Sequence, residues 1–412
     1  MQWKYCVLLA VLLSGEVEAA STDLNVHDIS IKQLQTHVNV LCAHAMQGRR
    51  SGTQGEILST QYIAHQFEQA GLLPAGDNGT YFQTFPFVSG GRWVKGRNVL
   101  AKLKINDDAN QVIIVGAHAD HLGRDPVKGM YPGADDNASG VASVLEVAHK
   151  LSQMKANSRL KGNKNIVFAA WGGEELGILG SSYFVKNIKN HIVKQDKLVA
   201  AINLDMVGHS NNRLILQGLA SSYDWRGMIN TVKKKYYASI IFQRDPYLPT
   251  DSTAFYVRGI PTLNFFTGAD NHYHTPFDKP ETLDFMGIKM ISEFLVDLVG
   301  ELEHQSRVIA YNEVQKPRMN TERGIRIYLG TIPDYASSDI RGVKLSGVIK
   351  QSPALQAGIQ SGDIIIKLAG KNIHDIYDYT SVLNTLRVGR WEKIVVKRGD
   401  KNLMLSIKAR GR

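Results

Sequence analysis

Cysteine is scarce in this chain of 412 residues, which has only Cys6 and Cys42. Cys6 lies in an N-terminal segment that we expect to be removed, so Cys42 has no partner for an intrachain disulfide. The mature chain must therefore be stabilised by packing or by bound metal rather than by cross-links.

Long apolar runs are also missing. A membrane span needs about 20 apolar residues, whereas the run Cys6–Leu13 ends at the polar residues 14–16. Lys4 before the run and the small-residue site at 17–19 are typical of a secretory signal peptide rather than of the alternative, a short membrane anchor. We predict a signal peptide over residues 1–19, no membrane span, and a secreted or periplasmic mature protein.

The excess of basic residues is not spread along the whole chain but lies mainly in its last quarter. The net charge is +10, with 48 basic and 38 acidic residues, and residues 311–412 alone carry 18 basic and nine acidic ones. Because neither an aromatic-studded basic groove nor zinc-finger spacing accompanies this excess, we expect no nucleic-acid partner. Affinity of the tail for an acidic surface remains open.

The composition itself is that of a folded protein. Apolar residues make up 43% and charged residues 21%, which excludes a disordered or fibrous class. At roughly 150 residues per domain, the length predicts two or three domains.

Apolar runs and helical periodicity alternate through the first three quarters of the chain. Four runs without a polar face predict buried strands: Gln111–Ala117, Asn165–Ala170, Leu198–Leu204 and Pro261–Phe266. Helical spacing predicts helices in five places: Ile31–Leu41, Leu58–Phe67, Ser139–Leu151, Ser181–Asn190 and Phe285–Leu302. This order is typical of an α/β domain, here a three-layer α/β/α domain with a largely parallel central sheet.

The last ninety residues have a different character. They contain short β-like runs around one short helix, which begins at Pro353 and ends at Gly358. We predict an α/β domain over residues 20–303, a polar linker over 304–322 and a small β-rich domain over 323–412.

Polar residues gather where the predicted strands end, which is where an α/β sheet keeps its site. They lie in five separate segments: His118-Ala119-Asp120, the loop 133–140 with Asp135 and Asp136, Glu174-Glu175, Asp205, and His272-Tyr273-His274. Crowded carboxylates raise one another's pKa unless cations neutralise them. Two divalent cations against three carboxylates remove this conflict, so the pattern predicts a metal site.

These motifs, in this order, resemble peptidase family M28, which comprises zinc aminopeptidases. The resemblance covers about residues 34–302 and implies two zinc ions. It assigns His118 and Asp205 to one ion, Glu175 and His274 to the other, and Asp136 as the bridge between them. Asp120 would orient His118.

The resemblance also implies catalytic roles. Glu174 would be the general base for a zinc-activated water, and Tyr273 would hydrogen-bond the developing oxyanion. Consecutive side chains diverge, so Glu175 can face a metal while Glu174 faces the water. Asp135 and Asp136 diverge in the same way, and the resemblance selects Asp136 as the bridge, which leaves Asp135 structural and expected to cap the following helix.

Other histidines are expected to be ordinary loop or surface residues: His121, His149, His191 and His209. His272 competes with His274 as a ligand, and the Tyr-His-Thr context favours His274. The family often has Ser-Asp-His where this chain has Thr250-Asp251-Ser252, so Asp251 matches and the histidine is missing. The span from Gly79 to Gln111 is too short for the insert of some relatives, which predicts a less covered site.

The C-terminal part resembles a PDZ domain of exported bacterial proteases. The likeness lies in Gly347-Val348-Ile349 and in the stretch 352–365, whereas the candidate carboxylate loop at 326–330 departs from the usual pattern. Such a domain can add an extended peptide to a strand edge. A peptide ligand and a packing or regulatory role both remain open.

The combined prediction is an exported metallo-aminopeptidase that removes N-terminal residues from peptides. A carboxypeptidase or glutaminyl cyclase of the same superfamily is the first alternative. The resemblance implies one zinc for the cyclase, which the ligand pair His118 and Asp205 disfavours. A catalytically dead peptide-binding scaffold is the second alternative, and it is disfavoured because no expected ligand is missing.

Overall fold

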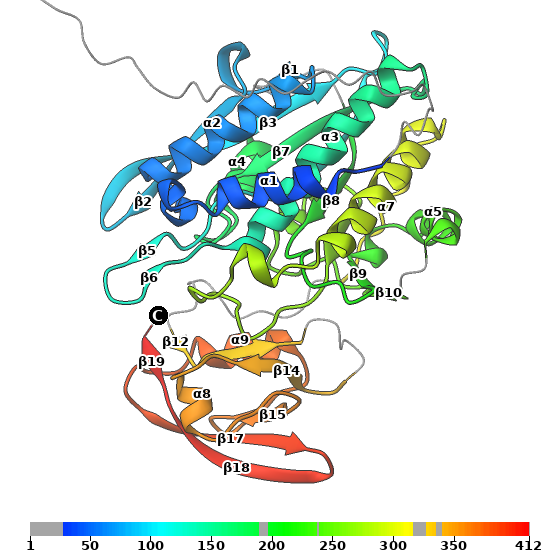
Figure 1. The fold of residues 1–412 in the computed structure, drawn as a ribbon. Coiled ribbons are helices and arrows are strands. Elements are labelled where there is room, and N and C mark those ends of the chain that lie inside the picture. Colours follow the sequence, from blue (N-terminus) through cyan, green and yellow to red (C-terminus); the bar gives the residue numbers. More distant parts are fainter. Residues whose placement is uncertain (1–27, 189–196, 237–238, 316–326, 335–339, 412) are drawn as a thin grey trace, which may run out of the picture.

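The computed structural model describes residues 28–188, 197–236, 239–315, 327–334 and 340–411. The predicted signal peptide and Cys6 lie outside the described residues, so the prediction about the N-terminus stays a prediction. Two domains are visible in Figure 1, a larger one up to residue 315 and a smaller one from residue 327.

The larger domain is built on a nine-stranded sheet with the order β1-β3-β7-β4-β8-β11-β9-β10, in which β2 also pairs with β3. Its strands are β1 Leu73–Pro74, β2 Phe82–Ser89, β3 Arg92–Leu103, β4 Gln111–His118, β7 Lys164–Trp171, β8 Lys197–Leu204, β9 Arg213–Gln217, β10 Ser239–Phe242 and β11 Thr262–Phe266. The four central strands β7, β4, β8 and β11 are parallel. Their carboxyl ends therefore meet at one edge.

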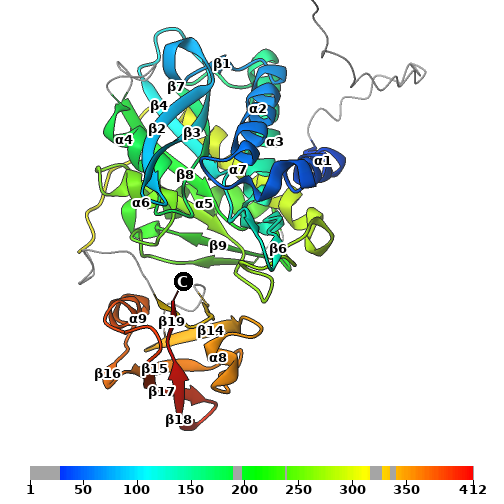
Figure 2. The same cartoon turned by 90° about the vertical axis from the view of Figure 1, so that its left-hand side faces the viewer.

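Both faces of the central strands are buried, which explains their continuous apolar sequences. In β4, Ile113 and Val115 join the core on one face, whereas Val112 and Ile114 join the core on the other. Helices cover both faces: α1 Ile31–Leu41, α2 Gln54–Gln69, α3 Gly140–Ala156, α5 Asp224–Val232 and α7 Phe285–His304 contribute to the first core, and α4 Leu179–Lys186 and α6 Asp251–Tyr256 to the second. The three layers are seen edge-on in Figure 2.

The predicted three-layer α/β/α fold is thus confirmed. Each of the four predicted buried strands is present, and α4 begins at Leu179, two residues before the prediction. The antiparallel hairpin β2–β3 was not predicted from the sequence. Its strands pair from Phe82 with Val99 to Ser89 with Arg92.

The smaller domain is β-rich and has its own core. Its elements are β12 Ile327–Tyr328, β13 Thr331–Pro333, β14 Val343–Val348, α8 Pro353–Gln356, β15 Ile364–Leu368, β16 Lys371–Asn372, α9 Ile376–Leu383, β17 Trp391–Arg398, β18 Lys401–Lys408 and β19 Arg410–Gly411. Ser352 caps α8 by accepting a hydrogen bond from Leu355 N, as the Ser-Pro start leads one to expect. Among the described residues, no helix is both long and apolar enough to cross a membrane.

The predicted linker does not leave the larger domain at once. Asp224 accepts hydrogen bonds from Arg307 and from Ala310 N, and Asn312 donates its side-chain amide to Ala220 O. The chain from 307 to 314 is therefore bound to the surface of the larger domain. The rest of the predicted linker, 316–322, lies outside the described residues.

Candidate metal centre

The carboxyl ends of the parallel strands bring the predicted site residues to one edge of the sheet. β4 ends at His118, β8 ends one residue before Asp205, and β7 ends three residues before Glu174. The segment after β11 supplies His274. Residues up to 156 positions apart in the chain thus meet because their strands are neighbours in the sheet.

Asp136 lies at the centre of the cluster and uses its two oxygens in opposite directions. Its Oδ1 lies 3.2 Å from His118 Nε2, and its Oδ2 lies 3.0 Å from His274 Nε2. The loop carrying it is fixed by Asp278, whose carboxylate accepts hydrogen bonds from Asp135 N at 2.7 Å and from Asp136 N at 3.1 Å. A carboxylate held in this way can bridge two cations.

The first donor group consists of His118, Asp136 and Asp205. His118 Nε2 lies 3.2 Å from Asp205 Oδ1, and its Nδ1 lies 3.2 Å from the carbonyl oxygen of Asp120. The ring is thus oriented by a backbone carbonyl, while the Asp120 carboxylate is 4.0 Å away. A donor set of one imidazole and two carboxylates suits zinc and leaves room for a further ligand.

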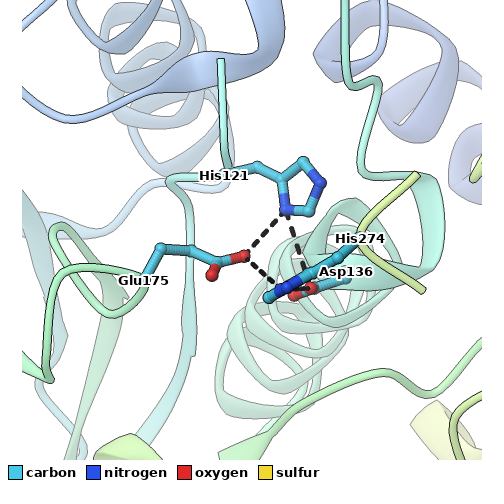
Figure 3. Close-up of side chains that lie close together, drawn as sticks. All are labelled: His121, Asp136, Glu175 and His274. Carbon is cyan, nitrogen blue, oxygen red and sulfur yellow. Dashed lines mark hydrogen bonds and ion pairs between the residues drawn. The ribbon is translucent and has the colours of Figure 1, made fainter. Parts of the chain in front are cut away.

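The second donor group consists of His121, Asp136, Glu175 and His274, shown in Figure 3. Glu175 Oε1 lies 2.9 Å from His121 Nδ1 and 3.1 Å from His274 Nε2. His121 lies in a loop and is hydrogen-bonded, as expected, but its buried ring points Nδ1 into this cluster. Two imidazoles and two carboxylates are again a donor set that zinc accepts.

The other histidines stay outside both groups. His272 Nδ1 bonds to Asp270 Oδ2 at 2.8 Å on the half-exposed side of its loop, so His274 is the residue of the pair that reaches the cluster. His149 bonds to Gln153. His209 Nε2 lies 3.8 Å from Asp135 Oδ2, and His191 lies outside the described residues.

The charges of the donor residues shift one another's pKa. Burial pushes the pKa of Glu175 upward, but the charge of His274 together with hydrogen bonds from His121 and His274 lowers the pKa to about 2. Burial opposes the charged form of His274, yet Glu175 and Asp136 raise its pKa to about 10. Divalent cations would take the place of these protons and leave the imidazoles neutral.

Glu174 is half-buried beside the first donor group. Burial raises its pKa well above the ordinary value, His118 opposes this shift, and the charges of Asp205 and Asp251 add to it. Its backbone N–H donates to Asp120 Oδ1 at 3.0 Å, and burial raises the pKa of Asp120 to about 7. Asp120 therefore contacts the backbone of Glu174 more closely than it contacts the ring of His118.

Tyr273, Asp251 and Asp135 complete the surroundings. The Tyr273 ring stacks on His274 at a centroid separation of 3.9 Å. Asp251 is fully buried and accepts a hydrogen bond from Ser181 Oγ. Asp135 is structural as expected, but its Oδ1 accepts from Gly208 N at 2.7 Å instead of capping α3.

Arg49 is a buried residue that sequence reasoning missed. Its guanidinium donates to the carbonyl oxygens of Ala119, Pro132 and Gly133, and thereby joins the two loops on either side of His121. These hydrogen-bond partners of Arg49 are backbone carbonyls, which any residue type can offer, so no sequence motif indicates them. Asp278, four residues after His274, was given no role from the sequence, although it accepts a hydrogen bond from Asp136 N.

Comparison with known proteins agrees with this geometry. The family model described as peptidase family M28 matches residues 98–299, and that of the PDZ domain matches residues 313–409. The chain is 29% identical over 265 residues to leupeptin-inactivating enzyme 1 of Streptomyces exfoliatus, covering 63% of this chain and 54% of that protein. It is 33% identical over 182 residues to leucine aminopeptidase 2 of Trichophyton rubrum, covering 42% and 34%. The chain thus spans about half or less of these relatives.

Solved structures share the fold. The LapA aminopeptidase of Legionella pneumophila superimposes with a TM-score of 0.55 at 21% identity, covering 67% of this chain and 73% of LapA. The zinc aminopeptidase BSAP of Bacillus subtilis gives 0.53 at 19%, covering 69% and 98%. The glutaminyl cyclase of Porphyromonas gingivalis gives 0.54 at 22%, covering 67% and 99%. At these identities the likeness concerns the fold.

Proposed function

We propose that this chain is an exported metallo-aminopeptidase. Its residues 98–299 belong to peptidase family M28, and its residues 313–409 form a PDZ domain. It hydrolyses N-terminal residues from peptides and uses two zinc ions. The observation that carries the proposal is the pair of donor groups that share Asp136 through opposite carboxylate oxygens. One curated relative is named as a leucine aminopeptidase, and two structural neighbours are named as aminopeptidases.

We assign the metal ligands as follows: His118 and Asp205 for one ion, Glu175 and His274 for the other, and Asp136 for both. Zinc ions at these positions would supply an activated water and polarise the scissile carbonyl. Asp120 acts as a positioning residue, because it binds the backbone of Glu174 and its carbonyl oxygen orients His118.

Glu174 is the proposed general base. It is half-buried next to the donor groups and is not needed as a ligand, so its carboxylate can accept the proton of the attacking water and pass it to the leaving amine. Burial and the charges of Asp205 and Asp251 raise the pKa of Glu174 above the ordinary value of a glutamate, which favours proton acceptance. Tyr273, stacked on His274, is the proposed donor to the developing oxyanion.

The mature protein is proposed to act outside the cytoplasm, as the N-terminal pattern Lys4, apolar run and small-residue site indicates. The PDZ domain is proposed to receive an extended peptide at the edge strand β13, which pairs with β14 and with no other strand in the described part of the chain. The peptide substrate or a protein partner could supply that segment.

Product analysis tests the proposal. The purified chain is incubated with a free peptide, an amino-blocked peptide and a carboxy-blocked peptide, with and without a chelator. We expect stepwise release of N-terminal residues from the free and carboxy-blocked peptides only, and no release with chelator. Cleavage of the amino-blocked peptide would overturn the aminopeptidase assignment.

The glutaminyl cyclase alternative has its own discriminating result. The Porphyromonas gingivalis glutaminyl cyclase has a related fold, so this alternative needs a test of its own. A peptide with N-terminal glutamine would then lose ammonia and become blocked, whereas an aminopeptidase releases free glutamine. Mass spectrometry separates these two products.

A further inference from the structure

The two donor groups that share Asp136 differ in the number of protein ligands they offer. We propose that His121 completes a four-ligand site with Asp136, Glu175 and His274 that fills first and retains its cation, whereas the three-ligand site of His118, Asp136 and Asp205 exchanges its cation. This inference rests on the proposed two-cation function and goes beyond it, because it assigns unequal roles to the two ions.

The separations within the four-ligand group come within about 0.4 Å of those around a single small cation. Metal–ligand bonds of about 2.0–2.2 Å in a tetrahedron place neighbouring ligand atoms about 3.3–3.6 Å apart. From His121 Nδ1, Glu175 Oε1 lies at 2.9 Å and Asp136 Oδ2 at 3.6 Å. From His274 Nε2, the same two oxygens lie at 3.1 Å and 3.0 Å. Each imidazole thus faces the same two oxygens, as Figure 3 shows.

His121 is held in this orientation by its surroundings. A Cβ atom on Gly133 would lie 2.6 Å from the His121 ring, and Gly133 has φ of +60°, so glycine is required there. Arg49 ties Ala119 O and Gly133 O together on the two sides of the ring. His121 Nε2 has no hydrogen-bond partner in the described part of the chain, so the ring is positioned by packing rather than by an outer hydrogen bond.

Charge does not distinguish the two groups. Each has one carboxylate of its own, Asp205 or Glu175, and both share Asp136. The difference is one imidazole, a ligand that zinc binds well. Four protein ligands close a tetrahedral site, whereas three leave an open position for water or substrate. The open position belongs to the group beside Glu174, where the proposed base is needed.

A simple hydrogen bond from His121 to Glu175 is the competing explanation. His121→Asn separates the two, because the Asn amide can still donate to Glu175 but is a poor zinc ligand. His121→Ala removes both interactions. His272→Ala is the matched control, since His272 belongs to the same loop as His274 but bonds to Asp270 away from the cluster.

The experiment measures zinc per chain by mass spectrometry after equilibration with a graded series of chelator concentrations. For the parent protein and His272→Ala we expect two steps, with one zinc retained to at least about 100-fold lower free zinc than the other. Even outer-sphere partners of zinc ligands change metal affinity by about 10–100-fold. His121→Ala and His121→Asn are expected to lose the tight step, and His118→Ala to lose the weak one.

Several results would overturn the inference: a single step in the parent, an unchanged tight step in His121→Asn, or loss of the tight step in His118→Ala. The release profile of the parent is a test in itself, so a variant that fails to fold does not decide the matter. If the parent binds two zinc ions in two steps but cleaves no peptide, the proposed function fails while this inference stands.

Discussion

At the scale of single residues, the adjacent glutamates are proposed to divide binding and catalysis between them. Glu174→Gln is expected to retain the zinc content of the parent and to reduce kcat by about 10²–10⁴-fold, because only the base is removed. Glu175→Gln is the matched variant, and it should lose zinc because a ligand is removed. Metal content and turnover measured on both proteins check this. Full activity of Glu174→Gln would exclude its role as the base.

Cys42 provides a test of the buried core near the site. Burial raises the pKa of its thiol to about 12, and only a smaller opposing effect comes from Arg49. At pH 8 about one thiol in ten thousand is then ionised, so a thiol reagent should label the mature native protein very slowly and label it fully in denaturant. Rapid stoichiometric labelling of the native protein would contradict this burial.

The same shift predicts a pH dependence of stability with a definite sign. An unfolded thiol ionises near pH 8.5, whereas the folded one holds its proton to about pH 12. The folded state therefore binds more protons within this window, and the contribution of Cys42 to the free energy of unfolding falls as the pH rises through it. Denaturant unfolding of the parent and of Cys42→Ala at pH 8 and 10 measures the difference.

The residues that sequence motifs singled out as metal ligands are brought together in the structure. His118, Asp136, Glu175, Asp205 and His274 all lie in the two donor groups. His121 could not be distinguished from other loop histidines, because its orientation depends on Gly133 and on Arg49 far away in the sequence. The missing signal is tertiary contact, which spacing along the chain does not carry.

At the scale of elements, the site depends on how the loop 133–139 is fastened to the segment after β11. Asp278 makes this connection with two hydrogen bonds to backbone N–H groups. In Asp278→Asn the amide can accept from only one of them, and a hydrogen bond to a charged group is worth about 1.5–3 kcal/mol. We expect a stability loss of about 2 kcal/mol and weaker zinc binding.

Thermal melts and chelator competition check this prediction. Asp125→Asn is the matched control, because Asp125 also accepts from two backbone N–H groups, those of Val127 and Lys128, but does so in an exposed turn. It should leave zinc binding unchanged. Equal effects of the two substitutions on zinc binding would show that Asp278 has no special part in placing Asp136.

Elements were predictable where one physical pattern dominated. The parallel strands are buried on both faces and so appear as unbroken apolar runs, as in β4 and β7. β3 was not recognised because its first residues, Arg92–Lys95, are largely exposed and only its second half is buried. α9 was not recognised either, since it is an eight-residue helix in which few turns can show a periodicity.

At the scale of the whole molecule, the two domains have separate cores. They meet loosely: a cavity of about 570 Å³ lies between them, lined among others by Arg226 and Arg244 from one domain and Asp334 and Asp375 from the other. Close to the metal centre, Lys350 lies 5.8 Å from the Phe277 ring. Sequence patterns identified both domains but carried no information on this contact.

Removal of all residues after Glu322 is therefore expected to leave the larger domain folded. Cleavage of small chromogenic substrates should stay within a few-fold of the full chain, because the donor groups and their supporting hydrogen bonds belong to residues before 285. Turnover and zinc content of the truncated and full chains check this. Loss of both in a folded, truncated protein would make the C-terminal domain part of the catalytic unit.

Imidazoles and carboxylates from distant strand ends are proposed to hold two metal ions that share Asp136. Anomalous X-ray diffraction measured on both sides of the zinc absorption edge tests it most directly. We predict two zinc peaks, one between His118 and Asp205 and the other between Glu175 and His274, with Asp136 between them. A single peak, or none, in crystals of active protein would contradict the account.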